Sequence, residues 1–317
     1  HAAKTLAGRM GIGERENFRF QLTVEEFCLC LIGLARTDKP LRIDLTGKRH
    51  LLRVAFTFEA SQLSLGGLNS TACAALRVTP DEPPRDLGLL LAAKTADRFH
   101  VAHEGDDRFR IEAEVDRRYP DLTPVRSPDS ARPPFRILRD PDAARLSQAA
   151  ALAMGAYPSW QCPASFQTPE RFADLVADGQ VACVCAVDAA GQTVGLLSWA
   201  PCSEQALLFS GPFVFAPGET RGAAAGILVD AFLQAVARER HAIVLTFRAT
   251  ADLPPGYFEP LGALQAPADD GCSQQTVLFR HLLEDMGQAV WCSPRIEGFL
   301  RQAYDRLAMP RDLLPVA

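Results

Sequence analysis

The chain of 317 residues is longer than one ordinary domain and predicts roughly two domains of about 150 residues each. Hydrophobic residues make up 48% and charged residues 22% of it, a balance typical of folded globular proteins that excludes wholesale disorder. The net charge of -5 argues against a general nucleic-acid clamp, and no apolar run approaches the roughly 18 residues of a membrane-spanning helix. We therefore expect no nucleic-acid partner and no membrane span.

The nine cysteines form no C-x-x-C pair. Cys183 and Cys185 stand in VACVCAV, which predicts a buried strand; they share one face of it but lie too far apart for easy disulfide closure. A metal site would need clustered partners, and His100 and His103 fall on opposite faces of a predicted strand. We expect free thiols in the core and a reducing, cytoplasmic compartment.

The clearest break in the chain is the segment YPDLTPVRSPDSARPP at 119–134, which holds five prolines and almost no apolar periodicity. Such a composition is typical of a linker. It predicts a first domain over 1–118, a second over 135–281 and a C-terminal extension over 282–317.

The first domain is predicted to be a helical layer on one antiparallel sheet. A helix over 14–36 places apolar residues at helical spacing, and two stretches alternate apolar and polar residues as hairpins do. The predicted features are the helix face of Phe18, Leu22, Leu29 and Ile32, a hairpin over 41–58 turning at Gly47, a loop over 60–84, a helix over 84–96, and a hairpin over 97–118 turning at 104–107.

The second domain mixes strands and helices, which makes the whole chain an α+β protein. The C-terminal extension adds an amphipathic helix capped by Ser293, which is expected to dock on its own chain or on a partner. The predicted elements are a strand, turn and helix over 135–154, a hairpin over 181–199 turning at 188–191, a strand over 206–215, a helix within 217–240 with Leu228, Ala231, Phe232, Ala235 and Val236 on one face, and strands over 242–248 and 275–280.

The most informative motif follows the strand that ends at Phe215. Small residues there let a ligand approach the backbone, and the N-terminus of the following helix offers unpaired N–H groups that suit a pyrophosphate. A guanidinium at the start adds a charge-assisted contact. Close packing of the helix is the alternative explanation for such small residues. The motif consists of Arg221, Gly222, Ala223, Ala224, Ala225 and Gly226.

This strand, motif and helix resemble the GNAT acyltransferase family, whose signature is R/Q-x-x-G-x-G/A. The resemblance covers about 134–281 and includes the later YFEPLGAL, in which Phe258, Leu261 and Gly262 match the family's ending. It implies that the main chain of Val214 and Phe215 faces the pantetheine of acetyl-CoA, that the segment from Arg221 to Gly226 holds the pyrophosphate, and that acetyl passes to an amine.

The segment also departs from the GNAT pattern. Ala224 replaces the first glycine of the signature, and the strand carries Ser210 but no glutamate as a base. The usual acid position is Phe258, with Tyr257 beside it. Tyr257 and Ser210 are therefore the candidates for proton transfer, and a packing role in a loop is the alternative for Tyr257.

The first domain resembles the histidine-kinase-type (GHKL) ATP-binding fold, in the form found in bacterial anti-sigma-factor kinases. Glu26 fits the family's catalytic glutamate, but Cys30 stands where an asparagine holds Mg²⁺, and a thiol is a poor ligand for that ion. Gly88 keeps a glycine-loop position, whereas the acid that reads adenine is missing. The resemblance implies a degenerate ATPase-like domain that has lost ATP and Mg²⁺ binding, with retained nucleotide binding as the alternative. Glu26 is either a relic of the catalytic position or an ordinary surface acid.

Two functions follow from these resemblances. The chain is a bacterial acetyltransferase whose acceptor is a small-molecule or protein amine, coupled to a degenerate regulatory domain. Alternatively it is a catalytically inactive, anti-sigma-like regulatory protein of bacterial signalling that binds a protein partner.

Overall fold

The computed structural model divides the chain into two compact units, 1–119 and 120–317, which are described separately. Gly88, most of the predicted 60–84 loop and the predicted helix after Ser293 lie outside the residues that it describes. Within the described part, no helix is long and apolar enough to cross a membrane. The described residues are 2–61, 92, 94–105, 107–123, 125–237, 239, 241–264 and 275–282.

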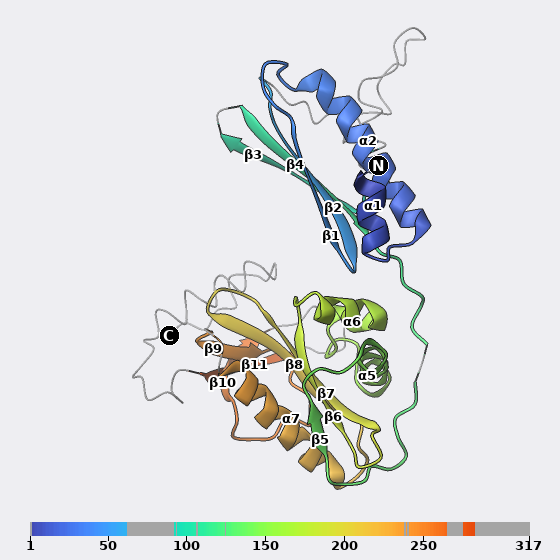
Figure 1. The fold of residues 1–317 in the computed structure, drawn as a ribbon. Helices are drawn as coiled ribbons and strands as arrows, with labels where there is room; N and C mark the ends of the chain where they lie inside the picture. The colour runs from blue at the N-terminus through green and yellow to red at the C-terminus, as the bar shows by residue number, and fades with distance from the viewer. Residues whose placement is uncertain are drawn as a thin grey trace. The chain divides into compact units, whose positions relative to one another are not determined.

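The first unit is a helical layer on one face of a four-stranded antiparallel sheet, as predicted (Figure 1). Its strands follow the order β1-β2-β4-β3, so the two hairpins join through β2 and β4. The elements are α1 (Ala2–Arg9), α2 (Glu14–Leu34), β1 (Arg42–Lys48), β2 (Leu51–Glu59), β3 (Arg98–Gly105) and β4 (Arg108–Asp116).

The core of the first unit shows that the predicted face of α2 was wrong. Phe20, Phe27 and Leu31 are buried against alternate residues of β2, while Phe18 and Leu29 are 66% and 68% exposed. Ile32 is also exposed and Leu22 is half-buried. Because α2 carries apolar residues on two faces, periodicity alone did not identify the face that meets the sheet.

The turn of the first hairpin also differs from the prediction. Gly47 lies inside β1, opposite Leu52, and the turn is formed by Arg49 and His50. A Cβ atom at Gly47 would lie 2.7 Å from Cγ of Met10, so the glycine lets α1 approach the sheet closely. The second hairpin turns at 104–107 as predicted.

The second unit is built on a seven-stranded sheet in the order β10-β11-β9-β8-β7-β6-β5. Only β8 and β9 run parallel; every other neighbouring pair is antiparallel. The strands are β5 (Arg136–Leu138), β6 (Ala182–Val187), β7 (Thr193–Pro201), β8 (Ala206–Val214), β9 (Ile243–Thr246), β10 (Glu259–Leu264) and β11 (Gln275–His281).

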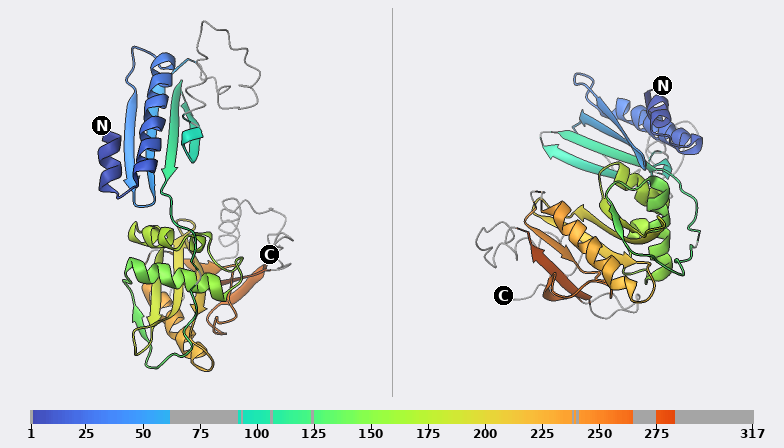
Figure 2. Two further views of the ribbon diagram at one scale, coloured as in Figure 1. Left: turned by 90° about the vertical axis from the view of Figure 1, so that its right-hand side faces the viewer. Right: turned by 60° about the horizontal axis from the view of Figure 1, so that its bottom comes forward.

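Helices cover both faces of this sheet (Figure 2). One face packs against α5 (Ala143–Ala156), η2 (Ala164–Gln167) and α6 (Pro169–Ala177), and the other packs against α7 (Thr220–Val236). The predicted α7 face is confirmed for Leu228, Ala231, Phe232 and Val236, which are buried, and Ala235 is partly buried beside them. The sequence prediction missed α1, α6 and β10.

The paired cysteines of β6 lie in the core, as predicted. Cys183 and Cys185 are buried in the cluster that joins the sheet to α5. Burial raises the pKa of the Cys183 thiol to about 12 and raises that of Cys185 as well, so both stay protonated and unreactive. The α+β class with an antiparallel and a mixed sheet is thus confirmed, while the ATPase-like assignment of the first unit stays a prediction.

Candidate functional site

The candidate site is the place where β8 and β9 separate. The two strands pair only through Ala206–Leu208 and Ile243–Leu245. β9 ends at Thr246, whereas β8 continues to Val214, and no described strand continues the pairing on that edge of β8. Two parallel strands that diverge leave backbone N–H and C=O groups without ladder partners, and these groups need others. We call this region, the edge of β8 over 209–214 that has no described strand partner and the segment after β9 that faces it, the β8–β9 groove.

A β-bulge in β8 lies beside the groove. Ser198 of β7 pairs with Ser210 and Leu196 pairs with Phe213, so Gly211 and Pro212 together oppose the single residue between the two β7 partners. Gly211 has a φ of 103°. A Cβ atom there would meet the Phe213 nitrogen at 2.9 Å, so only glycine fits this position.

The Val214 main chain points into the groove. Its N–H donates to Oη of Tyr157 at 2.6 Å, and its carbonyl lies 3.1 Å from the same hydroxyl. The neighbouring Phe215 N–H instead bonds to the carbonyl of Val194, on the β7 side. The N–H of Phe215 is thus engaged by β7, whereas both main-chain groups of Val214 bond to the hydroxyl of Tyr157.

The segment after β9 bonds both to the residues that follow α5 and to β8. Arg248 donates to the carbonyl of Cys162 at 3.0 Å, and Gln161 donates to the carbonyl of Ala249 at 3.1 Å. Thr250 donates to the carbonyl of Pro212 at 2.7 Å and so fills another acceptor of the groove. The first two bonds tie the segment after β9 to the residues that follow α5, and the third ties it to β8.

The charged part of the groove is a three-residue network. Arg221 donates from Nε and Nη2 to the two carboxylate oxygens of Asp252, at 2.8 and 2.6 Å. Nη2 also donates to Tyr157 Oη at 3.1 Å, and that hydroxyl bonds closely to Asp252 as well. We call these three residues the latch. A tyrosine hydroxyl has one proton, so Asp252 and the Val214 carbonyl compete for it.

Burial and charge set the protonation of the latch. Burial raises the pKa of Tyr157, and its bond to Asp252 raises it further, so the phenol keeps its proton at neutral pH. The bond to Asp252 also raises the pKa of Arg221. The groove therefore presents a neutral hydroxyl and an ion pair, and Tyr157 is suited to donate a proton rather than to accept one.

The predicted small-residue motif forms the first turns of α7, which begins at Thr220, rather than a loop before the helix. Gly222 and Ala223 are exposed, and a Cβ atom on Gly222 would meet nothing within 4 Å. Ala224 and Ala225 are buried in the core beneath the helix, so the Ala224 methyl does not obstruct the exposed side. The half-buried Gly226 follows them.

The N-terminus of α7 has no side-chain cap, although the N–H of Arg221 bonds to the carbonyl of Gly218 at 3.2 Å. The N-cap Glu219 makes no side-chain capping bond. The first N–H groups of a helix have no intrahelical partner and carry a partial positive charge. A short turn that includes Gly218, with a φ of 57°, connects this helix end to Val214. A groove with polar main-chain groups thus leads to a site suited to an anion.

The two predicted proton-transfer residues lie apart from the latch. Tyr257 donates to Asp230 at 2.9 Å, a bond that raises the pKa of Tyr257. Asp230 stands ten positions after Thr220 on α7, about 15 Å along the helix axis. Ser210 is half-buried on the part of β8 that pairs with β7 but not with β9, so it lies nearer the groove. Tyr157 and Asp252 were missed because 95 positions separate them in the sequence.

In the first unit, the predicted nucleotide residues are not gathered into a site by the described residues. Glu26 and Cys30 are half-buried on α2, where Glu26 lies one turn after Thr23, and Gly88 is outside the description. No group of three or more His, Cys, Asp or Glu residues able to hold a metal ion occurs in the described part of the chain.

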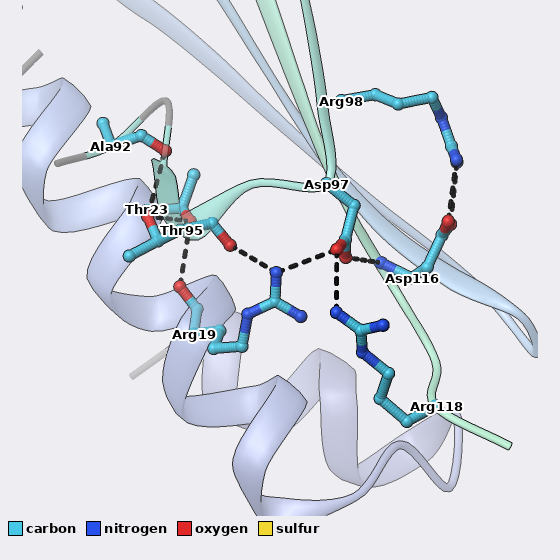
Figure 3. Close-up of polar contacts among 8 residues, drawn as sticks. All are labelled: Arg19, Thr23, Ala92, Thr95, Asp97, Arg98, Asp116 and Arg118. Carbon is cyan, nitrogen blue, oxygen red and sulfur yellow. Dashed lines mark hydrogen bonds and ion pairs between the residues drawn. The ribbon is translucent and has the colours of Figure 1, made fainter. Parts of the chain in front are cut away.

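The same region of α2 instead carries a self-contained polar cluster (Figure 3). Asp97 accepts hydrogen bonds from Arg19 at 3.0 Å, from Arg118 at 3.3 Å and from the N–H of Asp116 at 2.8 Å. Thr23 bonds to the hydroxyl of Thr95 at 2.9 Å. These bonds tie α2 to the sheet.

This cluster makes the stability of the first unit depend on pH in the acidic range. Burial alone would raise the pKa of Asp97, but its bonds from Arg19 and Asp116 outweigh that effect and lower the pKa. The stability that they confer is complete above the unfolded pKa of about 4 and is lost as pH falls through the lower folded pKa. We expect Asp97→Asn to remove this acid sensitivity and to cost about 1–2 kcal/mol at pH 7.

Hydrogen exchange of peptides from α2 and β4, measured between neutral pH and pH 3, tests this prediction. Asp38→Asn is the control, because Asp38 pairs with Arg36 on the surface and exposed pairs contribute little. Equal changes in the two variants would contradict the role given to Asp97.

The chain was compared with known proteins. No protein-family model matches it, and no curated protein is similar to it in sequence. Solved structures match about half of it. The aminoglycoside 6'-acetyltransferase type Ii is 14% identical over 46% of this chain and 97% of its own, with a TM-score of 0.35.

Two further solved structures give similar values. A mutant of the spermidine N-acetyltransferase SpeG from Vibrio cholerae is 14% identical over 48% of this chain and 96% of its own, with a TM-score of 0.38. The GNAT family N-acetyltransferase YhbS from Escherichia coli, solved with CoA, is 19% identical over 52% and 90%, with a TM-score of 0.33.

Proposed function

We propose that the second unit binds acetyl-CoA in the β8–β9 groove and transfers the acetyl group to an amine. The observation that carries this proposal is the Val214 main chain, which has no strand partner on the groove side and bonds there to a side-chain hydroxyl. An N–H and a C=O from one residue pair with an amide as one strand pairs with another. The pantetheine arm contains such amides.

The residues of the chain fit the rest of this substrate. The uncapped N-terminus of α7 and the exposed Gly222 lie a short turn beyond Val214 and suit the pyrophosphate. Arg221 adds a guanidinium that is 41% exposed, so it can reach an anion while it contacts Asp252. The small residues of the motif thus serve both packing and access.

The reaction needs two proton movements. The amine nitrogen attacks the thioester carbonyl carbon, a C–N bond forms, the C–S bond breaks, and the thiolate takes a proton while the amine loses one. We assign the donor role to Tyr157, because its raised pKa keeps the phenol protonated and acetyl-CoA, by taking its place at Val214, frees that proton for the thiolate. Ser210, on the part of β8 that is not paired with β9, is the remaining candidate to relay the amine proton toward water.

Calorimetric titration with acetyl-CoA tests the binding step. Gly222→Asp puts a negative charge at the exposed start of α7, and we expect it to weaken binding by about tenfold through repulsion of the pyrophosphate. Gly222→Asn has nearly the same size without the charge and should bind much as the wild type does. Absence of binding to the wild type at a ligand concentration of about 1 mM would refute the proposal.

A second function is favoured by the latch itself. Tyr157, Thr250 and the Arg221–Asp252 pair already satisfy the polar groups of the groove, and no carboxylate base stands on β8. In this case the chain is a catalytically inactive regulatory protein that acts through a protein partner. It predicts that Arg221→Ala leaves the cellular phenotype intact and that acetyl-CoA does not bind.

A further inference from the structure

A separate cavity of about 400 Å³ lies in the second unit. It is bounded by one side of α5, by the turn between β6 and β7, and by the segment 126–128 that precedes β5. The residues that matter for its chemistry are Arg126, Pro128, Arg145, Gln148, Leu152 and Gln192. None of them contributes to the β8–β9 groove.

Two guanidinium groups dominate the wall of this cavity. Arg145 is fixed through Nη1, which donates to the carbonyl of Gly191 at 2.9 Å and to Oγ1 of Thr193 at 3.1 Å. Its Nε and Nη2 donate to no described acceptor. Arg126 is exposed at the rim and makes no polar contact with the described residues. Several N–H donors are therefore available to a ligand.

Side-chain amides complement these charges. Gln148 stands one turn after Arg145 on α5, and Gln192 faces it from the turn between β6 and β7. Neither side chain bonds to another described residue, and an amide nitrogen adds donors of its own. Pro128 and Leu152 supply apolar surface beside these polar groups.

The nearby carboxylates do not neutralise the cavity wall. Asp142 caps α5 by accepting the N–H of Arg145 at 2.7 Å. Asp188 accepts the N–H groups of Ala190 and Gln192, at 2.9 and 2.8 Å, and that of Arg132. Both are held in backbone turns, and neither lines the cavity. The residues that line the cavity include two guanidinium groups and no carboxylate.

We propose that this cavity binds a small oxyanion, a carboxylate or a phosphate, carried on a compact molecule with an apolar part. Planar guanidinium groups match such oxygens through paired N–H bonds, and two of them converge here with two amides. The volume of about 400 Å³ falls in the range of small-molecule pockets. This site does not depend on the proposed acetyltransferase function.

The test uses the full-length chain and two probes, inorganic phosphate and butyrate, with neutral butyramide as a blank. The side-chain amide signals of Gln148 and Gln192, assigned through Gln148→Ala and Gln192→Ala, report binding by NMR. We expect saturable shifts with a Kd on the order of 1 mM for at least one anion and none for butyramide. If phosphate binds more tightly, the ligand of this cavity carries a phosphate; if butyrate binds more tightly, the ligand carries a carboxylate.

Arg126→Gln should weaken binding of the more tightly bound anion by about tenfold, because a hydrogen bond to a charged group contributes about that much to affinity. Arg132→Gln is the matched control: Arg132 lies in the same segment before β5, loses the same charge and does not line the cavity. Gly222→Asp should leave these shifts unchanged, which separates this site from the α7 N-terminus. No saturable shift with either anion, or equal loss in the two arginine variants, would overturn the proposal.

Discussion

Replacing Phe213 by Ala is expected to lower the free energy of unfolding of the second unit by about 3–5 kcal/mol. Its ring is fully buried, contacts Tyr157 edge to face with ring centres 5.2 Å apart, and lies 5.4 Å from Phe166. The substitution leaves a cavity between the sheet and α5 and removes the ring that supports the latch tyrosine. A loss of this size is a large part of the stability of a typical domain.

Urea unfolding followed by tryptophan fluorescence measures this loss. All three tryptophans of the chain, Trp160, Trp199 and Trp291, belong to the second unit. Phe213→Leu keeps most of the volume and should cost less than about 1.5 kcal/mol. If Phe213→Ala costs as little as Phe213→Leu, the ring does not have the packing role assigned to it.

Removal of the latch guanidinium by Arg221→Ala is expected to cost the second unit about 1–3 kcal/mol. Asp252 is only 11% exposed, so its carboxylate loses its charged partner and keeps little water in exchange. Asp252→Ala should cost a similar amount. The double variant should be more stable than the sum of the two predicts, by about 1 kcal/mol or more.

The control for this cycle is Arg136→Ala. Arg136 is an exposed arginine of β5 whose side chain makes no described polar contact, and its loss should change stability by less than about 0.5 kcal/mol. Additive single and double substitutions would show that Arg221 and Asp252 do not interact in solution.

Strong local patterns in the sequence predicted most of the second unit. The apolar run around Cys183 and Cys185 identified β6, and the spacing of Leu228, Ala231 and Phe232 identified the buried face of α7. The run is typical of a strand buried on both faces and the spacing of a helix buried on one. The start of α7 was harder to place, because residues as small as Gly222 and Ala223 fit both a loop and the first turn of a helix.

The first unit shows where such patterns fail. α2 carries Phe18 and Leu29 on one side and Phe20 and Phe27 on another, so its sequence is compatible with two buried faces. Only the sheet selects between them, and the sheet is assembled from segments far along the chain. The turn was wrongly predicted at Gly47 for a related reason. Its small size allows close contact with α1 and does not reverse the chain.

The candidate site was predicted in part. The sequence drew attention to Val214 and the helix start beyond it, whose role in binding a ligand stays a prediction, and the Val214 N–H bonds to Tyr157 beside the unpaired edge of β8. The sequence did not identify Tyr157 or Asp252 as site residues, because only tertiary contacts bring them together. The aromatic rings of Phe213 and Phe215 are buried beneath α5, so the latch residues and not these rings occupy the groove.

The central claim is that acetyl-CoA takes the place of the Tyr157 hydroxyl at Val214, and the dissociation constant of acetyl-CoA for Tyr157→Phe tests it most directly. The substitution removes bonds that stabilise only the ligand-free groove, so affinity should rise about fivefold to tenfold while turnover falls. Tyr257→Phe, which loses a hydroxyl bonded to Asp230, should leave affinity unchanged. Equal or weaker binding of acetyl-CoA by Tyr157→Phe would contradict the account.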